Sequence, residues 1–325
     1  MTPSVPRGTV LVATETFAAA VAEPQDLLQA EGFSIRLNTE HRPLTRDDYP
    51  RYLAGVQYVI AGLEPYDESV FAGYPEIRVL SRIGIGTDAI DFQAAKRHGI
   101  AVYNTPGAPS RSAAELAVAF MLGLARGIVD MTVDMRAGRW KPRLGFELEG
   151  KTLGLIGFGR VGKTVAGLTR TFGMRIVACD PIWDEHAARQ FEVERVDQAT
   201  LLKQADIVSL HLPLMPDTRY LINAEALDAM KRGAYLINTS RGGIVHAGAL
   251  IDRLRSGRLA GAALDVFEHE PNVGEFQGVP NLLMSPHVGS NTAEGRYRME
   301  MGAVKNLLAY VRAREAGLEP PRGLE

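Results

Sequence analysis

Cysteine is almost absent from this sequence. Of 325 residues only Cys179 is a cysteine, so no disulfide can form within the chain and no Cys-x-x-Cys metal site exists. The His-Glu-x-x-His spacing of another common zinc site is also missing. We therefore expect no metal site, and we expect a reducing, cytoplasmic environment.

An excess of charge of either sign is missing too. The chain has 36 Lys and Arg residues against 38 Asp and Glu residues, which gives a formal net charge of −2. This balance argues against a nucleic-acid partner and against an anionic membrane surface. No apolar run approaches the roughly 20 residues that span a bilayer, and the apolar segment Thr9–Ala13 is too short for a signal peptide. We expect neither nucleic acid nor membrane as a partner.

Short runs rich in β-branched residues recur along the chain and alternate with amphipathic stretches of helical length. Strands separated by helices in this way are typical of βαβ units with a parallel sheet. The sequence therefore predicts an α/β protein with two doubly wound parallel-sheet domains. The predicted strands are Thr9–Ala13, Phe33–Leu37, Val56–Ala61, Arg78–Arg82 and Ile100–Tyr103, then Thr152–Ile156, Arg175–Cys179, Asp206–Leu210, Ala234–Asn238, Gly261–Asp265 and Asn281–Ser285.

A cluster of turn-forming residues, Asn104–Ser110, separates the two sets of strands. A long apolar helix is predicted directly after it, over Arg111–Arg126, and a second helical pattern follows the last strand, over Thr292–Val311. The remaining tail, Arg312–Glu325, is rich in Pro and Gly and is predicted to fray. At about 100–200 residues per domain, this length favours two domains.

A Gly-x-Gly-x-x-Gly motif, formed by Gly157, Gly159 and Gly162, follows the predicted strand Thr152–Ile156 and opens a predicted helix over Lys163–Phe172. The first glycine permits a tight turn, the second lets the backbone approach a pyrophosphate, and the third lets the helix pack on the strand. The N-terminus of the helix presents its N–H groups to the phosphates. The motif therefore predicts a Rossmann domain that binds a dinucleotide.

An acidic residue, Asp180, ends the next predicted strand, 18 residues after Gly162. A carboxylate at this place accepts hydrogen bonds from both ribose hydroxyls of the cofactor and repels a 2′-phosphate. We therefore expect NAD rather than NADP.

Three charged residues follow three strands of the predicted cofactor domain: Arg241, Glu270 and His287. The carboxyl ends of parallel strands share one edge of the sheet, where ligands bind. Hydride transfer to a 2-keto acid needs a cation for the substrate, a proton donor for the forming alkoxide, and a group that keeps this donor protonated. Arg241 offers a planar fork and His287 a proton near neutral pH. Glu270 would orient His287 and raise its pKa.

Several motifs occur together and in one order that resembles the D-isomer-specific 2-hydroxyacid dehydrogenase family. They are Gly84–Asp91, Asn104–Pro106, Ser112–Ala117, Gly157–Gly162, His211–Pro213 and the three strand-end motifs. The resemblance implies that Arg241, Glu270 and His287 are catalytic, that the cofactor is NAD, and that the substrate is a small 2-hydroxy or 2-keto acid. It also implies a homodimer. The implied domains are a discontinuous, flavodoxin-like substrate domain at 1–107 and 291–325 and an NAD-binding Rossmann domain at 108–290.

The resemblance also implies individual contacts to the cofactor and the substrate. The cofactor contacts are Gly157, Gly159, Arg160, Val161, Gly162, Asp180, Leu212, Pro213, Thr239 and Asp265, the last two on the nicotinamide side. The substrate contacts are Arg82, Gly84, Ile85 and Gly86. The backbone N–H groups of Gly84–Gly86 are implied to hold the substrate carboxylate.

Within the family the resemblance is closest to the D-3-phosphoglycerate dehydrogenases, in a short form without regulatory domains. Ser81–Asp88, Asn104–Glu115 and Gly138–Trp140 carry it, and it implies 3-phosphoglycerate and 3-phosphohydroxypyruvate as substrates, with Arg82 on the phosphate. One departure is that Ala61–Glu64 lacks the arginine that those enzymes tend to place there. Two alternatives stay open: a hydroxypyruvate or glyoxylate reductase, and an NAD-sensing protein similar to a transcriptional corepressor.

Overall fold

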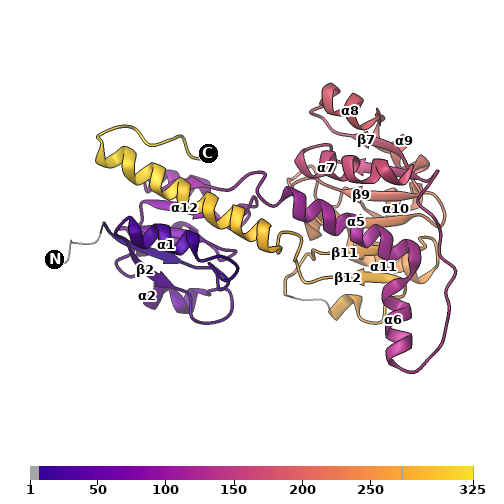
Figure 1. Cartoon of the computed structure of the whole chain (residues 1–325), viewed down its shortest axis with the longest axis horizontal. Helices are drawn as coiled ribbons and strands as arrows, with labels where there is room; N and C mark the ends of the chain where they lie inside the picture. Colours follow the sequence, from indigo (N-terminus) through magenta and orange to yellow (C-terminus); the bar gives the residue numbers. More distant parts are fainter. Residues whose placement is uncertain (1–6, 272–273, 325) are drawn as a thin grey trace. The chain divides into compact units, whose positions relative to one another are not determined.

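The computed structural model describes residues 7–271 and 274–324. The chain divides into two compact units (Figure 1). The first unit contains the chain up to Pro109 and again from Asn291 onward, and the second contains Ser110–Ser290. Each unit has its own parallel sheet with helices on both faces, so the predicted α/β class with two doubly wound sheets is confirmed.

The first unit has a five-stranded parallel sheet in the order β2-β1-β3-β4-β5, counted over the described residues. Its strands are β1 (Thr9–Val12), β2 (Ser34–Leu37), β3 (Tyr58–Ala61), β4 (Val79–Arg82) and β5 (Ala101–Tyr103). The chain turns back between β1 and β3, which is the switch point of a flavodoxin-like order. The carboxyl ends of these central strands therefore border the ligand edge of this sheet.

Two sets of helices cover the sheet of the first unit. One face packs against α2 (Tyr49–Tyr52), α3 (Glu68–Gly73) and α4 (Phe92–Arg97). The other face packs against α1 (Glu23–Ala30) and α12 (Ala293–Glu315), which lie beside each other in Figure 1. The core of the first unit thus combines the beginning and the end of the chain.

The predicted fraying of the tail is wrong. The first residues of the predicted tail continue α12 as far as Glu315. Further on, the backbone N–H of Leu324 donates to the carbonyl of Val102 at 2.8 Å, and the Tyr103 hydroxyl donates to the carbonyl of Pro321 at 2.6 Å. These bonds attach the tail to the open edge of β5, because an edge strand has backbone groups to offer.

The second unit has a seven-stranded parallel sheet in the order β12-β11-β10-β9-β6-β7-β8, again over the described residues. The strands are β6 (Thr152–Ile156), β7 (Arg175–Cys179), β8 (Val193–Arg195), β9 (Ile207–Leu210), β10 (Tyr235–Asn238), β11 (Gly261–Leu264) and β12 (Leu282–Met284). The three-residue strand β8 was not predicted. The switch point lies between β6 and β9, which is where a dinucleotide binds in this architecture.

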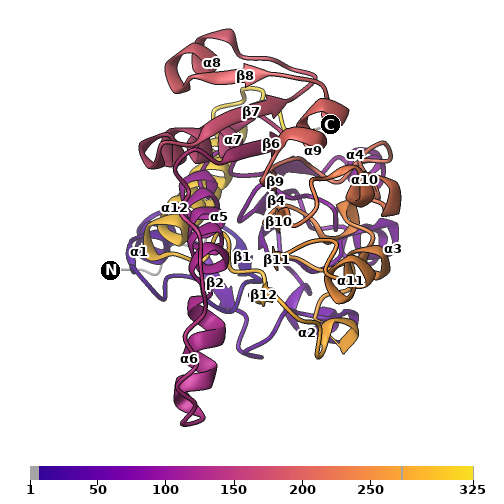
Figure 2. The same cartoon turned by 90° about the vertical axis from the view of Figure 1, so that its right-hand side faces the viewer.

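Both faces of this sheet are buried, as the continuous apolar strands require. One face packs against α5 (Ser110–Arg126), α7 (Arg160–Thr169) and α8 (Glu185–Phe191). The other packs against α9 (Gln198–Gln204), α10 (Ala224–Ala229) and α11 (Ala247–Arg255). Figure 2 shows α5 running along the sheet, while α6 (Ile128–Arg136) extends beyond its edge.

Among the described helices, none is by itself both long and apolar enough to cross a membrane. The pair α5 and α6 passes this test only when the two are joined, and they are bent by 65° relative to each other.

Candidate active site

A large crevice opens in the second unit at the carboxyl ends of β6, β7 and β9. Its volume is about 1590 Å³, and its wall includes Gly157, Asp180 and His211, one from each strand end. The crevice therefore lies at the topological switch point of the sheet. Five of the predicted cofactor contacts line it: Gly157, Gly159, Asp180, Leu212 and Pro213.

The three glycines of the motif have three different environments. Gly157 has φ +99°, and a Cβ there would lie 2.3 Å from the carbonyl oxygen of His211. A Cβ on Gly162 would lie 2.2 Å from the carbonyl oxygen of Gly157. Around Gly159, by contrast, a Cβ would meet no described atom within 4 Å. Two glycines are thus required by the turn and by helix packing, and the third leaves open the approach that a pyrophosphate would use.

Asp180 directly follows β7 and lies beside the glycine turn. Its Oδ2 accepts the backbone N–H of Phe158 at 2.7 Å, and its Oδ1 accepts that of Ile182 at 2.8 Å. The carboxyl group therefore fixes two segments of the crevice wall and keeps further lone pairs for a ribose. Among the predicted cofactor residues, Arg160 and Val161 lie in the first turn of α7 and are outside the described wall of the crevice.

Several residues of the crevice wall were missed from the sequence. Ile182 and Met215, on the loops after β7 and β9, are 84% and 52% exposed although both are large and apolar. Trp183 stacks on Phe158 with ring centroids 4.9 Å apart, and the Arg195 guanidinium lies 5.3 Å from the Trp183 ring. Apolar side chains exposed in a concave site suit the flat face of a base. A bulky apolar pair directly after a strand-end acid is the sequence signal that could have found Ile182 and Trp183.

The glycine motif also fits the spacing of a phosphate-binding P-loop, Gly-x-x-x-x-Gly-Lys-Thr, through Lys163 and Thr164. This second match was missed from the sequence. In the structure the Lys163 ammonium pairs with Asp184 at 2.5 Å, and the Thr164 hydroxyl donates to the carbonyl of Arg160. The two side chains therefore serve the helix and the neighbouring loop, and the geometry favours the dinucleotide interpretation.

Two further groups of the crevice have pKa values changed by burial. Burial lowers the pKa of His211 to about 4, so its imidazole is neutral near pH 7, and its Nε2 lies 2.9 Å from the Ser209 hydroxyl. Burial, helped by the nearby Asp180, raises the pKa of the Cys179 thiol to about 11. A thiol in this state is a weak nucleophile. Neither group is suited to acid–base or covalent chemistry at neutral pH.

Glu270 and His287 come together at the carboxyl edge of the same sheet. Nδ1 of His287 lies 2.6 Å from Oε2 of Glu270, and the other carboxyl oxygen of Glu270 accepts the backbone N–H of Phe267 at 2.9 Å. Burial tends to raise the pKa of Glu270, but the hydrogen bonds from His287 and Phe267, with the charge of Arg241, outweigh it and lower that pKa. Glu270 is therefore a carboxylate at neutral pH, held from both sides.

Arg241 follows β10, and its charge acts on Glu270. Its Nη1 donates to the carbonyl of Ser240 at 2.8 Å, and its own carbonyl accepts from the Asn238 side-chain amide at 2.9 Å. These two hydrogen bonds hold the backbone of Arg241 in place just before the short turn Gly242–Ile244. The three residues predicted as catalytic are all at the carboxyl ends of strands in one unit.

Asp265 holds the segment that carries His287. The Asp265 carboxylate accepts hydrogen bonds from the Ser285 hydroxyl at 2.5 Å and from the backbone N–H groups of Val288 and Gly289 at 2.8 and 2.7 Å. Its backbone carbonyl accepts the N–H of His287 at 2.8 Å. His287 has φ +52°, a conformation that a non-glycine residue rarely adopts, so this clamp stabilises an otherwise unfavourable backbone.

Thr239, the other residue predicted on the nicotinamide side, directly follows β10. Its hydroxyl is buried and has no hydrogen-bond partner among the described residues. A buried hydroxyl is normally hydrogen-bonded. The unpaired hydroxyl is what a polar ligand group at this strand end would satisfy.

The predicted substrate contacts lie in the first unit, in the segment that follows β4. The Gly84 N–H donates to the Thr105 hydroxyl at 2.9 Å, so it is already used within the unit, contrary to the role implied for it. The N–H groups of Ile85 and Gly86 donate to no group within the described residues. The Asn104 amide donates to the carbonyl of Ile85 at 2.8 Å and fixes this loop. Two adjacent N–H groups therefore remain for an anion.

The comparisons with known proteins agree with this geometry. Residues 118–289 match the family model described as D-isomer specific 2-hydroxyacid dehydrogenase, NAD binding domain. The chain is 38% identical over 294 residues to a hydroxypyruvate reductase from Thermotoga maritima, covering 87% of this chain and 95% of that protein. The chain belongs to the D-isomer specific 2-hydroxyacid dehydrogenase family. It is an NAD-dependent oxidoreductase, and the predicted family, enzyme class and cofactor are confirmed.

Further members of the family resemble this chain over different shares of their own length. A glyoxylate reductase from Thermococcus litoralis is 40% identical over 256 residues, which cover 76% of this chain and 77% of that protein. A D-3-phosphoglycerate dehydrogenase from Synechocystis is 37% identical over 264 residues, which cover 78% of this chain but 48% of that protein. The crystal structure of TT0316 from Thermus thermophilus matches with a TM-score of 0.87 and 35% identity, over 98% of this chain and all of that one.

The residues of the second unit fit NAD. The crevice has the switch-point position, the glycine turn has an open side at Gly159, and Thr239 has an unsatisfied hydroxyl. When bound, NAD(H) supplies or accepts the hydride. The chain would hold it with the glycine turn at the phosphates and Asp180 at the ribose, and at three strand ends it provides a cation, a carboxylate and an imidazole.

Proposed function

We propose that this dehydrogenase reduces short 2-keto acids, such as glyoxylate and hydroxypyruvate, to the corresponding 2-hydroxy acids, with the D configuration where the product is chiral. The observation that carries the proposal is the 2.6 Å contact between His287 Nδ1 and Glu270 Oε2 at the edge of the NAD-binding sheet. An imidazole held by a carboxylate through one nitrogen can exchange a proton through the other. Reduction of a carbonyl needs such a proton donor.

His287 is the proposed proton donor in the reductive direction and the proton acceptor in the oxidative one. Glu270 accepts from Nδ1, which leaves Nε2 to exchange the proton. The guanidinium of Arg241 offers two parallel donors for the carboxylate or the carbonyl oxygen of the substrate. Each of the three side chains thereby has one proposed task.

The substrate carboxylate is proposed to bind the N–H groups of Ile85 and Gly86, with Arg82 nearby. The Arg82 guanidinium lies against Gly84, where a Cβ would be 2.9 Å from Nη1. Adjacent backbone N–H groups and a cation form an anion site of ordinary chemistry. The proposed substrate domain is the first unit, the discontinuous one.

Two substrates compete in this proposal. The relatives named hydroxypyruvate reductase and glyoxylate reductase favour a plain 2-keto acid. A second candidate is 3-phosphohydroxypyruvate, which the position of Arg82 and the likeness to a D-3-phosphoglycerate dehydrogenase favour. The test is steady-state reduction with NADH of glyoxylate, hydroxypyruvate, pyruvate and 3-phosphohydroxypyruvate. The highest kcat/KM is expected for one of the first two, and turnover of none of them would refute the proposal.

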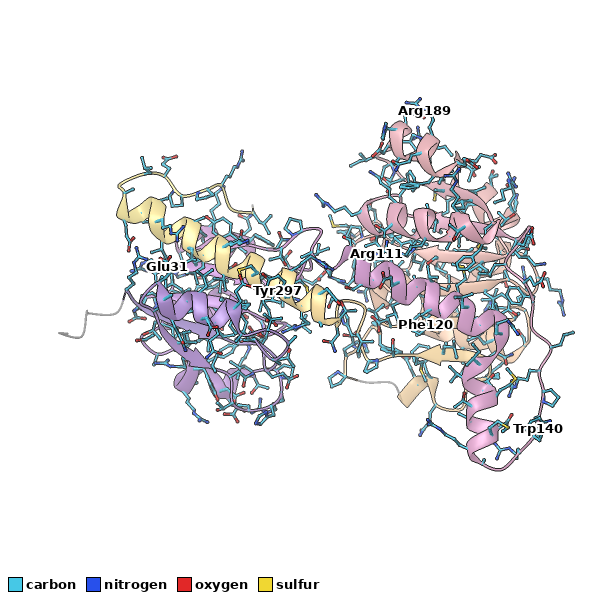
Figure 3. All side chains as sticks on the ribbon, viewed as in Figure 1. Glu31, Arg111, Phe120, Trp140, Arg189 and Tyr297 are labelled. Carbon is cyan, nitrogen blue, oxygen red and sulfur yellow. The ribbon has the colours of Figure 1, made fainter. Side chains whose placement is uncertain are left out.

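We also propose a homodimer. The helix α6 and the segment after it expose apolar side chains that no described part of the chain covers, and Trp140 lies beyond the end of this helix (Figure 3). They are Ile128, Val129, Val133, Met135, Trp140 and Leu144. An exposed apolar face of this kind marks an association surface. Light scattering should give twice the chain mass, and Val133→Glu should give a single chain mass.

A further inference from the structure

A buried carboxylate lies close to the proposed anion site of the first unit. Glu64 follows β3 and is 3% exposed. Its Oε1 accepts the backbone N–H of Gly62 at 2.7 Å and the Tyr66 hydroxyl at 2.8 Å. The carboxyl group is thus held by one backbone donor and one side-chain donor of its own segment. No ion pair joins Glu64 to a cation within the part of the chain that the structure describes.

Glu64 and Arg82 stand at the ends of two neighbouring strands. Ala61 of β3 pairs with Arg82 of β4, and the N–H of Ile83 donates to the carbonyl of Ala61 at 3.0 Å. A Cβ on Gly62 would lie 2.6 Å from Oε2 of Glu64. The Glu64 carboxyl group therefore lies against the end of β3, next to the strand that leads into the anion site.

The charges of Glu64 and Arg82 both act on the Tyr66 hydroxyl. Burial raises the pKa of the Tyr66 hydroxyl well above its ordinary value, Glu64 raises it further, and Arg82 lowers it. The same hydroxyl thus experiences the negative and the positive group. Glu64 and Arg82 thus act on one hydroxyl from the ends of two neighbouring strands.

We propose that Glu64 makes this enzyme discriminate against 2-keto acids that carry a second anionic group. This inference rests on the proposed function and narrows its substrate class to 2-keto acids whose carboxylate is their only anionic group. Such a substrate brings one negative charge, which the N–H groups of Ile85 and Gly86 with Arg82 can balance. A phosphorylated substrate adds about two negative charges, and these meet the carboxylate of Glu64 in a poorly hydrated site.

The test variant is Glu64→Gln. The amide keeps an oxygen that can accept from Gly62 and Tyr66, and it removes the charge. We expect wild-type enzyme to have a higher kcat/KM with hydroxypyruvate than with 3-phosphohydroxypyruvate. The variant should shift this ratio toward the phosphorylated substrate by about tenfold. We also expect inorganic phosphate to compete with glyoxylate, with an inhibition constant that is about tenfold lower in the variant than in wild-type enzyme.

The matched control is Glu76→Gln. Glu76 is an exposed acid of the same unit that lies before β4, at the opposite end of that strand. Removing its charge should leave both the substrate ratio and the phosphate inhibition unchanged. A merely structural role of Glu64 would lower the melting temperature and affect both substrates alike.

The outcomes separate this inference from the proposed function. Reduction of plain 2-keto acids with an unchanged ratio in a folded Glu64→Gln enzyme overturns the role of Glu64 alone. Wild-type enzyme that prefers 3-phosphohydroxypyruvate overturns it as well, and this comparison needs no variant to fold. Failure of the wild-type enzyme to reduce any 2-keto acid overturns the proposed function and this role with it.

Discussion

His287 Nδ1 lies 2.6 Å from Oε2 of Glu270, while Oε1 of the same carboxyl group accepts the backbone N–H of Phe267. The acid is thus tied to its own loop through one oxygen and orients the imidazole through the other. For the proposed proton donor this arrangement leaves Nε2 as the nitrogen that can exchange a proton, because the carboxylate can only accept from Nδ1.

Replacing His287 by Gln should abolish keto-acid reduction and spare cofactor binding. Loss of a positioned general acid typically costs about 10²- to 10⁴-fold in rate. The crevice at the switch point does not use His287, so the Kd for NADH, followed by fluorescence, should stay within about twofold of wild type. His186→Gln, on the exposed side of α8, is the control. A His287→Gln enzyme with full activity would contradict its role as proton donor.

Replacing Glu270 by Gln should shift the pH dependence of reduction. Without the carboxylate, Nδ1 of His287 loses its charged acceptor, so kcat/KM should fall, and the decline on the acid side that protonation of Glu270 causes should disappear. In wild-type enzyme the pKa of Glu270 is lowered, so Glu270 is ionised and paired with His287 at pH values above the ordinary carboxyl value of 4.5. The pair is lost only when the pH falls through the lower pKa of the folded enzyme. Initial rates across the pH range, with kcat and KM separated, measure both limbs. An identical profile in the variant would argue against the coupling.

Replacing Asp180 by Asn should relax the preference for NADH over NADPH. The amide oxygen can still accept from Phe158 or Ile182, whereas the charge that repels a 2′-phosphate is gone. The ratio of kcat/KM values for the two cofactors should change by about tenfold or more. Because both cofactors are measured on the same enzyme, a general loss of activity cancels, and an unchanged ratio removes the assignment.

The glycines of the motif provide a matched pair of variants. Gly162→Ala places a methyl group 2.2 Å from the Gly157 carbonyl, so the turn must shift, and unfolding should become easier by about 1–3 kcal/mol. Gly159→Ala meets no described atom within 4 Å and keeps φ near −78°. It should preserve the melting temperature and weaken NADH binding by about tenfold. Equal effects of both variants on stability and binding would contradict the division of roles.

The sequence predicted the parts of the fold that periodicity controls. Nine of the eleven predicted strands and the helix after Pro109 follow from buried apolar runs, because a strand covered on both faces has few polar residues to interrupt it. The short strand Val193–Arg195 has one buried residue and two exposed ones, so it carries no such signal. The tail was predicted to fray from its Pro and Gly content. Its bonds to Val102 and Tyr103 depend on an open strand edge that the local sequence does not reveal.

The sequence identified the candidate catalytic side chains from their residue types and their positions after strands. It did not identify residues whose contacts depend on distant parts of the chain. Strand-end positions identified Arg241, Glu270 and His287, since a sheet edge collects whatever follows its strands. The role implied for the Gly84 N–H ignored Thr105, which lies 21 residues away and uses that donor. Glu64 was noted only because an arginine was missing there. The burial of Glu64 and its place beside Arg82 can be seen only in the folded structure.

The order in which the two units can fold follows from the path of the chain. Ser110–Ser290 is continuous, whereas the core of the first unit needs Met299, Val304 and Leu307 beside Val10 and Val12. During synthesis the strands made first must therefore wait, with one apolar face uncovered, until α12 has left the ribosome. The nucleotide-binding half can complete its core before that moment. Newly made chains should thus acquire cofactor binding earlier than protease resistance of β1, and chaperone contacts should concentrate on the amino-terminal strands.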